Sequence, residues 1–105
     1  MALKSDLDHA GVVETELFIG GKWVPASSGN RFDVLDPATG DVIATVADGG
    51  ESDAIAAVDA AAEAGPAWAA SAPRVRGEAL RRAWELMTER ADDLAKLISL
   101  SLIHI

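Results

Sequence analysis

The fold class is decided by residues 31–62, which read RFDVLDPATGDVIATVADGGESDAIAAVDAAA. The first part carries short apolar runs on both sides of a turn signal, Asp36-Pro37 followed by Gly40. Proline fixes φ and pushes the residue before it out of the helical region, so a strand pair is expected around this turn. After Gly49-Gly50 the apolar period changes from two to about 3.6 residues. Strands followed by helices predict an α/β chain.

A second strand pair is predicted upstream, where residues 16–24 read ELFIGGKWV. Two short apolar runs flank Gly20-Gly21, and both glycines can take the positive φ of a tight hairpin turn. The segment PASSGN at 25–30 predicts a loop, because its residues favour turns over strand ladders. Residues 1–15 are polar and mixed, which predicts a loose amino-terminal arm.

Two or three helices are predicted after Gly50. Ser52 is the expected cap of a first helix that begins at Asp53 and stops at Gly65-Pro66. Ser71 and Pro73 are expected to open a longer helix. A break at residues 90–92 then precedes a third helix.

Apolar residues recur at helical spacing, so each helix is expected to direct one face inward. The expected inward residues are Ile55, Val58 and Ala62 in the first helix, Val75, Leu80, Ala83, Trp84 and Met87 in the second, and Leu94, Leu97 and Ile98 in the third. Trp23, Trp68 and Trp84 are the largest apolar groups, and we expect them to anchor a core or a packing interface rather than a ligand.

The composition excludes several classes of protein. With 105 residues the chain is one domain at most. Its formal net charge is −8, from 17 acidic and 9 basic residues, which disfavours nucleic acid and anionic membranes as partners. Cysteine is absent, so this chain holds no disulfide, thiolate zinc site or cysteine nucleophile. Without a signal-peptide core or an apolar run of ~20 residues, a cytoplasmic chain is expected.

No residues are predicted as catalytic, cofactor-binding or metal sites. His9 and His104, the only histidines, have no assignable partners. Gly20-Gly21 precede a strand, whereas a phosphate-binding turn precedes a helix. The acids at 51–53 and 92–93 stand at expected helix starts, where the helix dipole alone favours them.

Four of the basic residues lie in RVRGEALRR at 74–82. Arg74, Arg81 and Arg82 are candidates for an anion site. Ion pairing with Glu78 and Glu85 at helical spacing is the interpretation we favour.

Several segments taken together resemble the aldehyde dehydrogenase family. The resemblance covers about residues 16–100. It includes the opening LFIGGKWV, the turn DPATG, the strand VIATV and the stretch AGPAWAASAPRVRGEALRRAWELMTERADDLAKLISL. Each motif is weak alone, but their order and spacing are specific. Within the family, these motifs are most similar to those of bacterial succinate-semialdehyde dehydrogenases.

The resemblance implies a parent enzyme several times longer than this chain. Such enzymes are homo-oligomeric, NAD(P)-dependent oxidoreductases that convert a small aldehyde, here succinate semialdehyde as the favoured substrate, to the carboxylic acid. They use a cysteine nucleophile, a glutamate base, an asparagine amide in the oxyanion hole and a glycine-bearing turn for the dinucleotide. None of these groups lies in the matched stretch. The chain alone is therefore expected to be inactive and to bind neither NAD nor NADP.

The resemblance also implies boundaries. Residues 16–100 match the amino-terminal part of the family's cofactor-binding domain, and residues 101–105 are expected to be a non-native tail, because the agreement ends abruptly at Leu100. In some members an acid at the position of Ser101, with carbonyls of the strand at Val34 and Leu35, lines a monovalent-cation site. Ser101 lacks that charge, so no such site is assigned.

Strands without their partners leave apolar faces and edges unburied, which predicts a marginal, association-prone chain. A small acidic interaction module that docks through an apolar carboxy-terminal helix is the alternative. Its helical stripe consists of Leu94, Leu97, Ile98, Ser101, Leu102 and Ile105.

Overall fold

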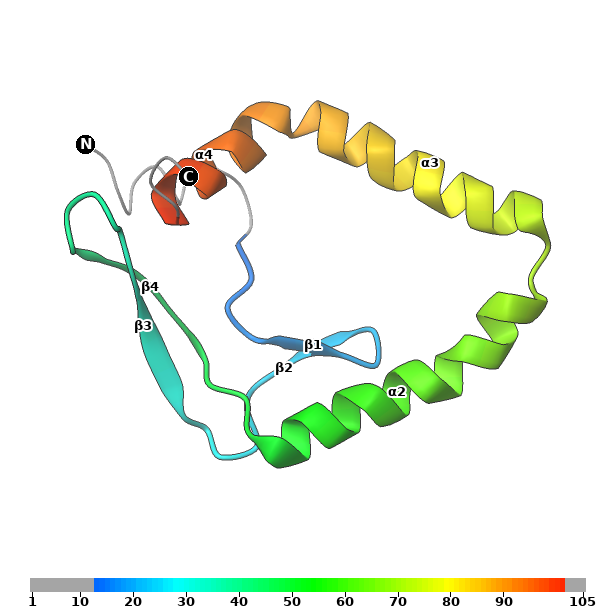
Figure 1. The fold of residues 1–105 in the computed structure, drawn as a ribbon, viewed down its shortest axis with the longest axis horizontal. Helices are drawn as coiled ribbons and strands as arrows, with labels where there is room; N and C mark the ends of the chain where they lie inside the picture. Colours follow the sequence, from blue (N-terminus) through cyan, green and yellow to red (C-terminus); the bar gives the residue numbers. More distant parts are fainter. Residues whose placement is uncertain (1–12, 102–105) are drawn as a thin grey trace.

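The computed structural model describes residues 13–101, so most of the predicted arm, together with His9, His104 and residues 102–105, lies outside the described residues. The elements follow in the order β1 (Leu17–Ile19), β2 (Lys22–Val24), β3 (Arg31–Leu35), β4 (Val42–Ala47), α2 (Glu51–Ala70), α3 (Pro73–Glu89) and α4 (Ala91–Ser101). Two antiparallel strand pairs come first and helices follow (Figure 1). This order confirms the predicted α/β class.

The first strand pair is a tight hairpin. β1 and β2 are antiparallel, with Leu17 opposite Val24 and Ile19 opposite Lys22. Gly20 and Gly21 form the turn with φ values of 60° and 78°. Positive φ at both central residues is the signature of a type I′ turn, whose twist matches that of the flanking strands. The predicted role of the two glycines is confirmed.

Gly21→Ala is expected to destabilise this hairpin by about 1 kcal/mol, because an L-residue pays roughly 1–2 kcal/mol in the left-handed region. A Cβ at this position would meet no heavy atom within 4 Å, so backbone strain is the only cost. Hydrogen exchange of the β1 and β2 amides should become about fivefold faster. Gly77→Ala in α3 is the matched control, and equal exchange in both variants would contradict the assignment.

The second strand pair is joined by the Asp36-Pro37 turn. β3 and β4 are antiparallel, with Arg31 opposite Ala47 and an irregularity between Val34 and Leu35. The buried Asp36 organises the turn: its Oδ1 accepts the Ala38 N–H at 2.9 Å, and its carbonyl accepts the Gly40 N–H at 2.7 Å. A side chain that accepts the N–H two residues ahead is the Asx turn that aspartate favours.

Helix α2 differs from the prediction at both ends. It begins at Glu51, with Gly50 rather than Ser52 in the cap position. The start moves because the Asp53 carboxylate, in the third helical position, accepts the Gly50 N–H at 3.0 Å. The predicted stop at Gly65-Pro66 is wrong, since the helix continues through Pro66 to Ala70. Proline removes one helical hydrogen bond, and the neighbouring alanines, which have the highest helix propensity, continue the helix.

The junction of α2 and α3 corrects the role of Ser71. Ser71 ends α2 instead of opening α3: its N–H and hydroxyl both donate to the Trp68 carbonyl, at 3.2 and 2.6 Å. Pro73 is the first residue of α3, as predicted, where its missing N–H leaves no bond unmade. The predicted break before the third helix is also confirmed, because Arg90 ends α3 and α4 begins at Ala91.

The described chain is open rather than closely packed. Its radius of gyration is 16.8 Å, against about 13 Å for a compact domain of this length. The three described helices follow one another along an arc, and the strand pairs lie on the other side of it (Figure 1). The buried apolar residues are Ala26, Ile43, Ala47 and Leu100, which make only a small core.

The predicted inward faces are therefore not buried by the described chain. No residue of α2 or α3 is buried. Leu80 is 70% exposed and Trp84 is 64% exposed, although with Ala83 and Met87 they line one face of α3. The helical spacing places these residues on one face, but no described element of the chain covers it, so their inward orientation stays a prediction.

The predicted inward face of α2 is wrong. Ile55 and Val58 are 55% and 67% exposed, whereas Ala57 and Ala60 line the side of the helix that lies against the β1–β2 hairpin. The small alanines allow the hairpin to approach this side closely.

Candidate functional site

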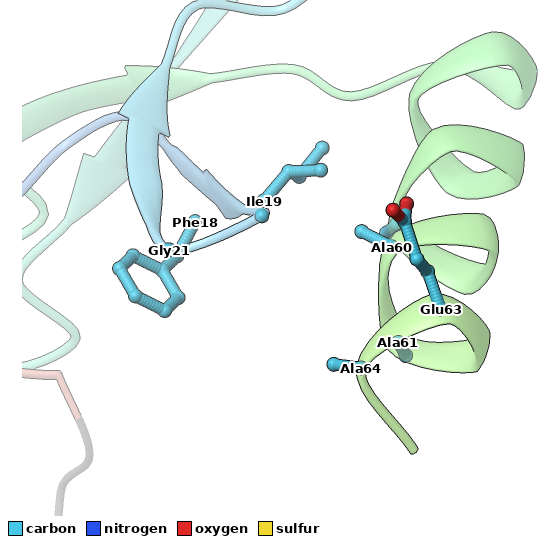
Figure 2. Close-up of a pocket in the computed structure, with 9 residues that line it drawn as sticks. Phe18, Ile19, Gly21, Ala60, Ala61, Glu63 and Ala64 are labelled. Carbon is cyan, nitrogen blue, oxygen red and sulfur yellow. The ribbon is translucent and has the colours of Figure 1, made fainter. Parts of the chain in front are cut away.

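An apolar groove lies between the β1–β2 hairpin and α2. It has a volume of about 620 Å³. Ile19 extends from the hairpin toward α2, and Ala60 and Ala64 face the hairpin from the helix (Figure 2). A smaller hollow of about 270 Å³ continues the groove along Leu17 and Gly49 to the first turn of α2. Gly20 and Gly21 line the groove as a hairpin turn, which agrees with the rejection of a phosphate-binding loop.

A cluster of hydrogen bonds closes one end of this groove. The Asp53 carboxylate accepts the Ser27 N–H at 3.1 and 3.2 Å, the Ser27 hydroxyl at 3.3 Å and the Gly50 N–H at 3.0 Å. The Ser27 and Ser52 hydroxyls are 2.8 Å apart. The Gly50 N–H, followed by the amide and hydroxyl of Ser27, holds the pKa of Asp53 below its ordinary value, although partial desolvation acts in the opposite direction.

Sequence reasoning missed this cluster. It placed Asp53 correctly in the first turn of a helix and Ser27 correctly in a loop, but it did not join them. An aspartate at the third helical position signals a bond to its own helix start. No local signal indicates a partner 26 residues earlier in the chain.

Arg31 joins the second strand pair to the segment before β1. Its guanidinium contacts the Glu16 carboxylate, donates to the Thr15 hydroxyl at 2.9 Å and donates to the Thr45 carbonyl at 2.7 Å. The Ala47 N–H donates to the Thr15 carbonyl at 2.8 Å. These contacts hold the segment before β1 against the β3–β4 strand pair. They also occupy the guanidinium with protein groups.

The charged face of α3 is ion-paired. Arg81 lies 3.3 Å from Glu78 and 2.9 Å from Glu85, and Arg82 lies 3.2 Å from Glu85. These exposed pairs contribute little to stability, about 0.3–0.5 kcal/mol each. They confirm the favoured interpretation of this segment for Arg81 and Arg82, because carboxylates already occupy the two cations.

The three tryptophans are half exposed or more. Trp23 packs against Phe18 across the hairpin, with ring centroids 4.9 Å apart. Trp68 and Trp84 lie on α2 and α3, whose residues are not buried. The described chain therefore does not use them as core anchors, which leaves the predicted role in a packing interface as a prediction.

Residues 13–101 hold neither a metal-ligand cluster nor a helix that could span a membrane. Within this range no three histidine, aspartate or glutamate side chains converge as a metal site. None of the helices in the same range has the length and apolarity needed to span a bilayer. The prediction that the chain carries no catalytic or cofactor-binding residue stays a prediction.

The sequence matches a known family model. Residues 23–102 match the model of the Aldehyde dehydrogenase family, which is more than half of the chain. The match passes Leu100 and includes residue 102, so it does not separate residues 101–105 from the rest. Their assignment as a non-native tail stays a prediction.

Curated relatives and solved structures extend this match. The glutarate-semialdehyde dehydrogenase of Pseudomonas putida is 41% identical over 93 residues, which cover 89% of this chain and 19% of the relative. The NADP(+) succinate-semialdehyde dehydrogenase of Escherichia coli is 38% identical, covering 90% of this chain and 20% of the relative. A crystal structure of betaine aldehyde dehydrogenase from Staphylococcus aureus with NAD+ superimposes with a TM-score of 0.85 at 29% identity, over 93% of this chain and 19% of that one. The chain thus spans about a fifth of the length of its relatives.

Proposed function

The chain belongs to the aldehyde dehydrogenase family, and on this premise we propose that it supplies the amino-terminal framework of an NAD(P)-dependent enzyme that oxidises a small aldehyde to the carboxylic acid. Succinate semialdehyde is the favoured substrate. Two of the relatives are named for semialdehydes, one for succinate semialdehyde and one for glutarate semialdehyde. Both compounds carry an aldehyde at one end and a carboxylate at the other. The relatives support either NAD or NADP as the oxidant.

The single observation that carries the framework role is the uncovered apolar face of α3. This face consists of Leu80, Ala83, Trp84 and Met87 and repeats at the spacing of a core-facing helix. Burying apolar surface stabilises a protein by about 25 cal/mol per Å². A face of this kind is suited to packing against further elements of a larger enzyme, and the superposition on the betaine aldehyde dehydrogenase supports the same placement.

The framework role leaves the chemical steps to other residues. Attack on an aldehyde carbonyl requires a nucleophile such as a thiolate, and this chain contains no cysteine. A dinucleotide bound in the parent enzyme would supply the hydride acceptor, and no residue of this chain is assigned to hold it. The residues of this chain hold strands and helices in position and take no part in proton or hydride transfer.

A chimera tests the proposal. Residues 16–100 replace the aligned segment of the Pseudomonas putida glutarate-semialdehyde dehydrogenase, and NAD(P)H formation with glutarate semialdehyde is followed by absorbance. The chimera is expected to keep kcat within about tenfold of the unmodified enzyme, because scaffold changes that preserve backbone position cost little transition-state binding. The isolated 105-residue chain is expected to reduce neither dinucleotide.

Two outcomes would contradict the proposal. Aldehyde-dependent reduction of NAD or NADP by the isolated chain would show that it carries chemistry of its own. A folded chimera without activity would show that the segment does not serve as this framework. A chimera that carries a scrambled 16–100 segment of equal composition is the control. It should be inactive, which would show that the rest of the Pseudomonas putida enzyme does not supply the activity without this framework.

The interaction-module alternative has one observation in its favour, the 61% exposure of Ile98 in α4. Of the other stripe residues whose side chains the structure describes, Leu94 is 36% exposed and Leu97 is partly buried. Deleting residues 101–105 from the 105-residue chain discriminates the two functions, because loss of a specific partner supports the module and the absence of any effect supports the framework.

A further inference from the structure

We propose that Asp53 is a positioning residue, whose carboxylate fastens the loop at 25–30 to the first turn of α2 and thereby sets the separation between the β1–β2 hairpin and the helix. This inference concerns how the groove is built. It stands on the geometry of the Asp53 cluster and does not depend on the proposed function.

The hairpin and the helix otherwise meet through apolar contacts alone. Leu17 lies against Gly49, and a Cβ added to Gly49 would lie 3.4 Å from a δ carbon of Leu17. Ile19 faces Ala60 and Ala64 across the groove (Figure 2). Such contacts are non-directional. A helix face lined by alanines offers few side chains to interlock with, so apolar contact by itself permits the hairpin to slide or tilt.

The Asp53 cluster supplies the missing direction. Within residues 13–101, its bonds from Ser27 to Asp53 and Ser52 are the only hydrogen bonds that join segment 16–30 to α2. Ser27 is the third residue after β2, and Ala26, next to it, is buried. The carboxylate is held on the helix side by the Gly50 N–H. This side chain therefore ties the end of the hairpin directly to the helix, whereas the Asp48 N–H bond to the Asn30 carbonyl and the Ala47 N–H bond to the Thr15 carbonyl reach only the residues before α2.

The bonds require an ionised aspartate with two acceptor oxygens. Backbone N–H groups of Ser27 and Gly50 and the Ser27 hydroxyl all donate to Asp53. In Asp53→Asn, the remaining oxygen can take the Oδ2 position and keep the Gly50 N–H, but the NH₂ group then stands where Oδ1 accepted the Ser27 N–H at 3.1 Å, and two donors face each other there. Asparagine has almost the same size and no negative charge, so the exchange weakens the Ser27 bonds without opening a cavity.

The absence of native cysteine allows a direct measurement of the separation. Lys22→Cys on β2 and Asp59→Cys on α2, both exposed, carry spin labels in the full 105-residue chain. Double electron–electron resonance is expected to give one narrow distance distribution in the parent and a distribution at least twice as broad after Asp53→Asn. Hydrogen exchange of the Ser27 amide should become at least tenfold faster.

Two further variants keep the test decisive. Glu51→Gln removes a charge from the same helical turn without touching the cluster, and it is expected to leave the distribution unchanged. Ser27→Pro deletes the Ser27 N–H and leaves α2 intact, so it should broaden the distribution like Asp53→Asn even if the latter unfolds the helix. A parent distribution as broad as that of Asp53→Asn, or equal distributions in Asp53→Asn and Glu51→Gln, would overturn the proposal.

Discussion

Replacing Leu80 and Trp84 together by glutamine is expected to convert the isolated chain from a self-associating species to a monomer, and to destabilise the chimeric enzyme. In the isolated chain both side chains are exposed, so the exchange removes apolar surface from solvent and costs little folding free energy. In the chimera we expect the same face to be covered, and replacing a buried tryptophan or leucine by glutamine should cost about 2–5 kcal/mol each, because apolar packing is lost and a polar amide is buried. One pair of substitutions thus has opposite consequences in the two contexts.

Sedimentation velocity at several concentrations measures the association, and thermal unfolding with the aldehyde assay measures the chimera. The matched control is Arg82→Gln with Glu89→Gln, which leaves the net charge unchanged and lies on the opposite face of α3. This control should leave the isolated chain associated and the chimera active. If the Leu80 and Trp84 variant unfolds the isolated chain as much as the chimera, the face is already buried without the rest of the enzyme.

Local physical chemistry made the strand pairs predictable. Gly20-Gly21 between two apolar runs favours a tight hairpin turn, and the structure places both residues at the positive φ that this turn requires. Asp36-Pro37 and Gly40 determine the second turn in the same way, through a fixed proline φ and a permissive glycine. In both cases the deciding interactions lie within a few residues, which is the range over which sequence patterns are informative.

The errors arise where a local signal competes with its surroundings. Pro66 is a helix breaker in isolation, yet the alanines on both sides carry α2 through it. Ser52 and Ser71 are both good amino-terminal caps, but Asp53 moves the start of α2, and Ser71 closes α2 through the Trp68 carbonyl. Propensity identifies residues that can end a helix, and hydrogen bonding decides which of them does.

The candidate site was the least predictable feature. Its groove depends on the β1–β2 hairpin lying against α2, and its closed end depends on Ser27 meeting Asp53. These contacts join residues far apart in sequence, and helical or strand periodicity indicates only that a face exists. Periodicity does not indicate what covers that face, which is why the predicted inward residues of α3 are exposed in the described chain.

Ile43→Ala is expected to cause the largest loss of stability among single substitutions in this chain. Ile43 on β4 is 5% exposed and is the largest side chain in the β-sheet part of the small core. Deleting its buried methyl and methylene groups removes their transfer free energy and leaves a cavity, at a cost of about 2–4 kcal/mol. The core contains few other large side chains, so little surrounding structure is available to collapse into the space.

Val42→Ala provides the matched control, because Val42 is the preceding residue, lies in the same strand and is 51% exposed. Successive side chains of a strand point to opposite faces, so this change should cost about 0.5 kcal/mol or less. Urea unfolding and amide exchange in β3 and β4 measure both variants. A small and equal effect of the two substitutions would mean that β4 has no buried face, and that the strand pair is held by its turn and ladder bonds alone. A large effect confined to Ile43→Ala would instead show that packing around Ile43 supplies most of the core's contribution to the free energy of unfolding of this open chain.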